Sequence, residues 1–134
     1  MLRPETRARA RALQLLYAWE LQGRPELHSV LSGLARDGPA SDAAAVRLAE
    51  AVAADAARLD REVAAAVEHW RPERIGVVER AILRLAVHEL LTQRAPAPVV
   101  IDEAIRLARW FAGSRAPAFV NGVLDAIARR LGRL

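Results

Sequence analysis

Apolar residues recur along this chain at the three- and four-residue spacing of helices, and no stretch alternates apolar and polar residues as a half-buried strand would. Proline and glycine divide the chain into segments rich in strong helix formers. The pattern predicts helices at residues 4–22, 26–36, 41–69, 75–93, 99–112 and 117–131. A break in the long third helix, around residues 57–60, brings the expected number to about seven. We therefore predict an all-α fold.

The segment 75–93 is expected at the centre of the helical bundle. Its apolar residues lie on two sides of the helix, and its only polar strip consists of Arg80, Arg84 and His88. A helix that is apolar around most of its circumference is buried. The segments 99–112 and 117–131 carry apolar stripes of their own, so we expect them to pack around it.

The length and composition describe one ordinary domain. The chain has 134 residues, and 53% of them are hydrophobic. No run approaches the roughly 18 apolar residues of a membrane span, so we expect a soluble, cytoplasmic protein. There is no cysteine, which excludes disulfides, thiol catalysis and cysteine-ligated zinc.

Charge is distributed unevenly along the chain. All 20 basic residues are arginine, and they outnumber the 16 acidic residues. Residues 1–36 carry six arginines and three acids, residues 37–69 three and seven, and residues 70–134 eleven and six. Alanine is also abundant, at 29 residues, so part of the arginine excess reflects a general compositional bias. Two basic segments flanking an acidic one indicate a face specialised for an anion.

The first predicted helix carries an arginine stripe. At about 100° per residue, one face collects four polar residues, Arg3, Arg7, Arg11 and Gln14. Tyr17 borders this stripe, Arg9 lies on its flank, and the opposite face is apolar. Guanidinium groups grip phosphates and stack on bases, as tyrosine rings do, so the pattern suits RNA. A solvated helix face and, less favoured, a membrane contact are the alternatives.

Few residues suggest catalysis. The three histidines lack metal-ligand spacing, and no serine or glycine-rich motif forms a nucleophile elbow or a phosphate loop. Asp102 and Glu103 suit the start of a helix better than acid–base chemistry. Gly122, inside a predicted helix, indicates close approach by another helix, or else by a ligand. We expect no enzyme activity, no metal and no cofactor.

Four segments in this order resemble a known family. After the arginine-rich start come residues 12–20 (ALQLLYAWE), 78–86 (VERAILRLA), 101–108 (IDEAIRLA) and 119–125 (FVNGVLD). They are similar to the NusB family of bacterial transcription antitermination factors, over nearly the whole length. The resemblance implies one NusB-like domain made of two helical subdomains, at about residues 1–70 and 71–134.

The resemblance also implies partners and a role. Members of the family pair with NusE, a small-subunit ribosomal protein, and together they bind the single-stranded boxA element of nascent ribosomal RNA. The complex joins other Nus factors on RNA polymerase and suppresses termination. We therefore expect boxA RNA, NusE, the other Nus factors and RNA polymerase as partners, with a homodimer as a further state of the free protein.

Site residues follow from the family's positions. The expected RNA-contacting residues are Arg3, Arg7, Arg9, Arg11, Gln14, Tyr17, Arg80, Arg84, Arg115 and Phe119. Tyr17 and Glu79 match positions associated with the partner protein. At Arg115 some relatives carry an acidic residue, so an added phosphate contact is expected there.

Two other functions fit parts of the sequence. Some ribosomal RNA cytosine methyltransferases begin with a NusB-like domain, but their last helix tends to read Asn-Ala-Val-Leu-Arg, where this chain has Asn121, Gly122 and Asp125. The other alternative is a helical protein-interaction module without any RNA role. Salt dependence separates RNA binding from that alternative.

Overall fold

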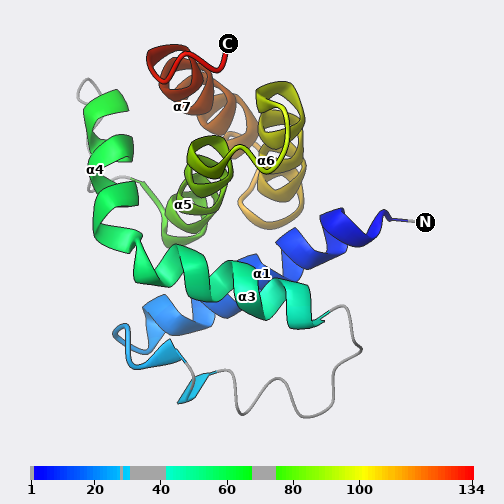
Figure 1. Cartoon of the computed structure of the whole chain (residues 1–134), viewed down its shortest axis with the longest axis vertical. Coiled ribbons are helices and arrows are strands. Elements are labelled where there is room, and N and C mark those ends of the chain that lie inside the picture. The colour runs from blue at the N-terminus through cyan, green and yellow to red at the C-terminus, as the bar shows by residue number, and fades with distance from the viewer. Residues whose placement is uncertain (1, 28, 31–41, 68–74) are drawn as a thin grey trace. The chain divides into compact units, whose positions relative to one another are not determined.

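The computed structural model describes residues 2–27, 29, 30, 42–67 and 75–134, and the regular secondary structure in these ranges is helical. Six helices are defined there, with no strand: α1 (Pro4–Leu21), α3 (Asp42–Ala54), α4 (Ala56–Ala66), α5 (Val77–Thr92), α6 (Ala97–Phe111) and α7 (Ala116–Arg130) (Figure 1). The predicted all-α fold is confirmed. None of the helices in these ranges has the length and apolar character needed to cross a membrane.

The chain forms two compact units, Met1–Asp55 and Ala56–Leu134. The division coincides with the break that separates α3 from α4, so a break in the segment 41–69 is present, but at Asp55, before the predicted residues 57–60. There the amide of Asp55 donates to the carbonyl of Val52, three residues back, in place of the α-helical four. The expected subdomain boundary near residue 70, like most of the expected helix 26–36, lies outside the described residues.

In the first unit, α1 packs against α3. The buried side chains of α1 include Ala12, Leu15, Leu16 and Trp19, and those of α3 include Ala45, Leu48, Ala49 and Val52. The two buried alanines of α3 are four residues apart and present little bulk to α1, so the larger side chains of α1 have room to pack. This contact covers one side of α1.

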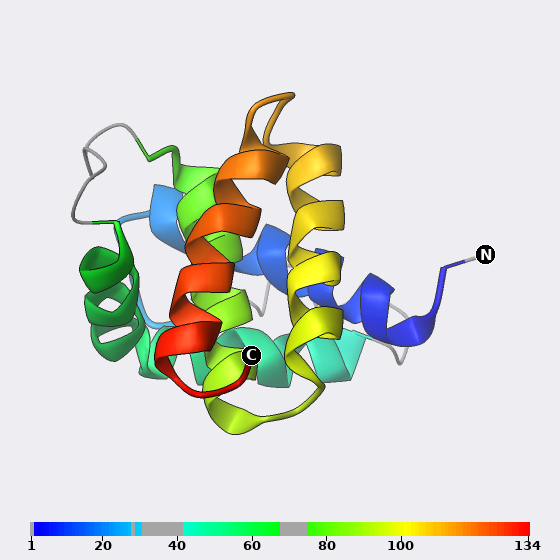
Figure 2. The same cartoon turned by 90° about the horizontal axis from the view of Figure 1, so that it is seen from above.

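In the second unit, α5 lies at the centre, in contact with α4, α6 and α7. All ten residues from 81 to 90 are buried, which confirms the prediction of a central helix. Four of the largest fully buried side chains of the protein are Ile82, Leu83, Leu85 and Leu90. Helices α6 and α7 run side by side in opposite directions, joined by a short turn at the top of Figure 2.

Candidate nucleic-acid interface

Helix α1 begins and ends at positions that the local sequence determines. Arg3 precedes the helix in an extended conformation and Pro4 occupies its first turn, where the missing amide hydrogen of proline costs nothing. Glu5 in the first turn places a negative charge at the positive end of the helix dipole. At the other end Gly23 adopts φ +82°, and its amide and that of Arg24 donate to the carbonyls of Glu20 and Trp19.

The exposed side of α1 carries the predicted arginine stripe. Arg3, Arg7, Gln14 and Tyr17 are exposed, and Arg11 is half-exposed. The guanidinium of Arg11 donates to the Gln14 side-chain oxygen at 3.2 Å. This bond holds a cation and an amide next to each other, a combination that can contact a phosphate and a base edge together. We call these five residues the α1 face.

Arg9 does not belong to the α1 face. It is only 8% exposed and lies on the buried side of the helix, in line with Leu13 and Leu16. Helix geometry accounts for this, because two residues along the helix correspond to a rotation of about 200° and so carry Arg9 away from both Arg7 and Arg11. The expectation that Arg9 contacts RNA therefore finds no exposed side chain in the structure.

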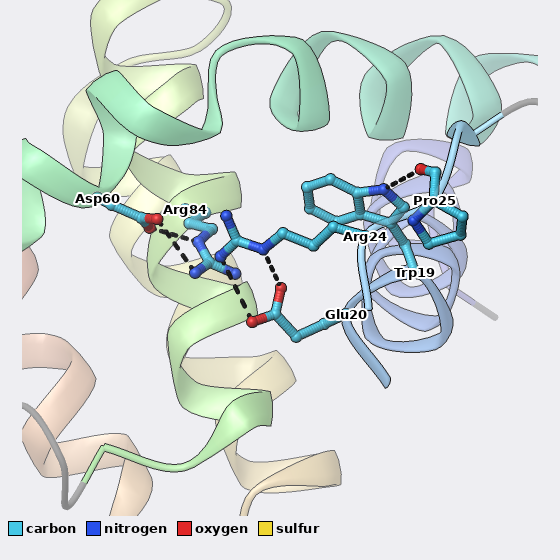
Figure 3. Close-up of polar contacts among 6 residues, drawn as sticks. All are labelled: Trp19, Glu20, Arg24, Pro25, Asp60 and Arg84. Carbon is cyan, nitrogen blue, oxygen red and sulfur yellow. Dashed lines mark hydrogen bonds and ion pairs between the residues drawn. The ribbon is translucent and has the colours of Figure 1, made fainter. Parts of the chain in front are cut away.

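Contacts near the end of α1 hold the helix end and the residues that follow it. The indole nitrogen of Trp19 donates to the Pro25 carbonyl at 2.8 Å (Figure 3). Arg24 pairs with Glu20 at 2.8 Å, and its guanidinium lies over the Trp19 ring, 5.2 Å from the centroid. A cation held over an aromatic ring stabilises both groups. Arg24 was not among the predicted site residues, although Glu20 four residues earlier indicates the ion pair.

Arg84 is buried in the second unit. Only 3% of its side chain is exposed, and its guanidinium donates to both carboxylate oxygens of Asp60 on α4, at 2.5 and 3.3 Å (Figure 3). A two-pronged pair of this kind fixes the orientation of both side chains. In this structure Arg84 thus links α5 to α4, and it does not present its guanidinium to solvent as the expected RNA contact requires.

Arg80 and Glu79 lie at the start of α5 and are both half-buried. The carboxylate of Glu79 accepts a hydrogen bond from the Gly76 amide, which satisfies one of the unpaired donors at the helix start. Arg80 donates to the Ile75 carbonyl at 3.3 Å. Both side chains therefore have structural contacts at the positions where RNA and partner contacts were expected.

Arg115 and Phe119 lie together at the start of α7. Arg115 is the residue that precedes the helix and is exposed, while Phe119, one turn later, is half-buried. This placement leaves Arg115 available to an anion, as expected, and leaves part of the Phe119 ring accessible.

The surroundings of Gly122 differ from the expected close approach of another helix. It is exposed, and a Cβ atom built at this position would meet nothing within 4 Å. The prediction that another helix approaches closely at Gly122 is therefore wrong. A glycine inside a helix costs about 1 kcal/mol relative to alanine, a cost that a surface helix tolerates without any packing reason.

Metal binding finds no support in the ranges that the structure covers, because no three histidine, aspartate or glutamate side chains gather there as ligands. The expected site residues fall into four groups. Four residues of the α1 face are exposed and Arg11 is half-exposed. The others are Arg115 and Phe119 at the start of α7, the half-buried Glu79 and Arg80 at the start of α5, and the buried Arg9 and Arg84.

Comparisons with known proteins identify the family. The NusB family model matches residues 6–129. A relative from Solibacter usitatus, called transcription antitermination protein NusB, is 41% identical and covers 93% of this chain and 88% of its own. One of the same name from Sorangium cellulosum is 38% identical, covering 94% and 92%.

Solved structures give the same result. The structure of T. maritima NusB has a TM-score of 0.83 at 30% identity and covers 96% of this chain and 93% of its own. A NusB chain from a complex of antitermination factors NusB and NusE with double-stranded RNA has a TM-score of 0.78, also at 30% identity, and covers 97% and 99%. The chain belongs to the NusB family.

Proposed function

We propose that this protein is a transcription antitermination factor that binds RNA through the α1 face and acts together with a NusE-type ribosomal protein. The observation that carries the proposal is the exposed row of arginines on α1, with an amide and a phenol beside it. The names of the relatives support the role in antitermination, and the described complex of NusB, NusE and RNA supports the two partners.

The chemistry of the α1 face suits a single strand such as boxA. Arg3, Arg7 and Arg11 neutralise backbone phosphates and position the strand, which gives affinity with little sequence preference. Gln14 hydrogen-bonds to the edges of unpaired bases, and the exposed ring of Tyr17 stacks on one of them. At the start of α7, Arg115 adds a phosphate contact and Phe119 a stacking surface.

The buried residues take a different part in this proposal. Arg9 and Arg84 hold helices in place and do not touch RNA. Glu79, fixed by the Gly76 amide, presents its remaining carboxylate surface to the partner protein, and Tyr17 lies where RNA and partner meet. The protein performs no reaction: it assembles RNA, partner, the other Nus factors and RNA polymerase in the bacterial cytoplasm, where nascent RNA is made.

Partner and RNA strengthen each other's binding by the same factor, because coupling between two sites is reciprocal. The test is fluorescence anisotropy of a labelled boxA RNA and of a scrambled RNA, each titrated with the protein in the presence and absence of NusE. The proposal predicts that boxA RNA binds more tightly when NusE is present and that the scrambled RNA binds more weakly than boxA RNA. Equal weak binding to both RNAs, unaffected by NusE, would contradict it.

A helical module that binds only proteins is the competing function. It predicts no regular dependence of RNA affinity on salt, whereas single-strand binding weakens with log salt by about 0.7 per phosphate contact. The same titration, repeated over a salt series, separates the two.

A further inference from the structure

The C-terminal turn of α6 exposes two large aromatic side chains. Trp110 is 43% exposed and Phe111 is 42% exposed, and their ring centroids lie 6.2 Å apart with the planes at 88°. Aromatic rings of this size are usually buried, as Trp19 is at 7%. An exposed pair in edge-to-face contact is therefore a surface feature that the fold does not explain.

Two arginines lie near this pair in the sequence of α6. The guanidinium of Arg106 lies over the Trp110 ring, 5.9 Å from its centroid, and also pairs with Glu103 at 3.7 Å. Arg109 is exposed in the last turn of α6. We call Arg106, Arg109, Trp110 and Phe111 the α6 platform.

Arg115 lies at the same end of the α6–α7 hairpin as the α6 platform. The connecting turn is short, because Gly113 adopts φ +90° and its carbonyl accepts a hydrogen bond from the Ala116 amide at 3.3 Å. Figure 2 shows this turn joining the end of α6 to the start of α7. Three arginines and two exposed aromatic rings are thus carried by one end of the α6–α7 hairpin.

We propose that the α6 platform binds unpaired nucleotides of RNA, with one base stacked on Trp110 and the flanking phosphates held by Arg109 and Arg115. Flat exposed rings interleaved with arginines are the surface that single-stranded nucleic acid requires, since every base offers a π-face and every nucleotide a negative charge. The inference rests on the proposed function for its ligand class, but it adds a contact site on α6, which carries none of the predicted site residues.

The cation over Trp110 helps to prepare the site. Contact with Arg106 restricts the indole before RNA arrives, so less side-chain entropy is lost when a base stacks on the ring. A protein partner is a less suitable occupant, because the three arginines of the hairpin end would need acidic groups opposite them, whereas RNA supplies a phosphate at every nucleotide.

Three variants test the platform. Trp110→Ala removes the stacking surface, Trp110→Phe keeps an aromatic ring, and Val99→Ala removes an equally exposed apolar side chain from the other end of α6 as a control. Affinity is measured by anisotropy with a single-stranded leader RNA that contains boxA and its flanking nucleotides, over a salt series. Circular dichroism of each variant checks that the helices are intact.

Trp110→Ala is expected to weaken binding about tenfold, which corresponds to about 1.4 kcal/mol and lies within the range for loss of one stacked base. The slope of log affinity against log salt should not change, because no phosphate contact is lost. Trp110→Phe should retain most of the affinity, and Val99→Ala all of it. With 4-thiouridine in the RNA, ultraviolet light should cross-link the peptide that contains Trp110.

Three results would contradict the inference, and each has a different consequence for the proposed function. If Trp110→Ala binds RNA as the wild type does, the platform is not an RNA site, while the proposed function stands. If Trp110→Ala loses affinity only for NusE, the platform docks protein and the inference is overturned. If the wild-type protein binds no RNA under any condition, the proposed function and the inference both fail.

Discussion

Replacing Arg84 by methionine tests whether this arginine stabilises the fold or contacts RNA. Arg84 belongs to a segment shared with the family and was expected to contact RNA, yet its side chain is 3% exposed and bound to Asp60. Methionine preserves most of the apolar stem of arginine and removes the guanidinium. The substitution should therefore cost stability and leave RNA affinity unchanged.

The size of the expected stability loss follows from the burial of Arg84 and Asp60. Removing one member of a fully buried ion pair costs about 3–5 kcal/mol, and an exposed pair contributes about 0–1 kcal/mol. The Asp60 side chain is 36% exposed, so water hydrates much of its carboxylate once Arg84 is gone. We therefore expect the free energy of unfolding to fall by about 2 kcal/mol, which for a chain of this length lowers Tm by about 8 °C.

Thermal unfolding followed by circular dichroism measures the stability, and anisotropy with boxA RNA well below both midpoints measures binding by the folded protein. Arg61→Met is the matched control, since Arg61 is exposed on α4 and its loss should change stability by less than about 0.5 kcal/mol. If Arg84→Met instead unfolds at the wild-type temperature but binds RNA more weakly, with a flatter salt slope, the structural reasoning is refuted and Arg84 contacts RNA.

Two glycines provide further predictions. Gly122→Ala should raise the free energy of unfolding by about 0.5–1 kcal/mol, because the added methyl group meets nothing within 4 Å and the helix gains a better former; an unchanged or lower value in urea unfolding would show that a neighbour approaches after all. Gly76→Ala should lower the free energy of unfolding by about 1 kcal/mol, because the new Cβ would clash with the Glu79 carboxylate and displace it from the Gly76 amide. Thermal unfolding checks this, and an unaltered Tm would mean that Glu79 does not stabilise the start of α5.

Much of α1 and α5 could be predicted from local periodicity. A rotation of about 100° per residue is enough to separate the exposed stripe of α1 from its buried side, and a helix apolar on two sides has to be central. The same geometry could have placed Arg9 with Leu13 and Leu16 on the buried side. Arg9 was predicted on the flank of the stripe, although its spacing to Leu13 and Leu16 could be read from the sequence.

The contacts of Arg84 and Gly122 could not be predicted in this way. Asp60 lies 24 residues before Arg84 on another helix, so the pair exists only after α4 packs on α5. The surroundings of Gly122 likewise depend on which side of α7 faces the core, and a glycine alone does not distinguish close packing from open solvent. Trp110 was missed because a tryptophan at the edge of an apolar stripe fits core and surface equally well.

The central claim is that the arginines of α1 hold RNA phosphates, and a salt series on matched double variants tests it most directly. Arg7→Ala with Arg11→Ala removes two arginines of the α1 face, whereas Arg47→Ala with Arg61→Ala removes two exposed arginines elsewhere and changes the net charge equally. We predict that the first pair weakens boxA binding and flattens the slope of log affinity against log salt by about 1.4, or about 0.7 for each contact. The second pair should leave the slope as it is. Equal slopes for both pairs, with the helices intact, would contradict the account.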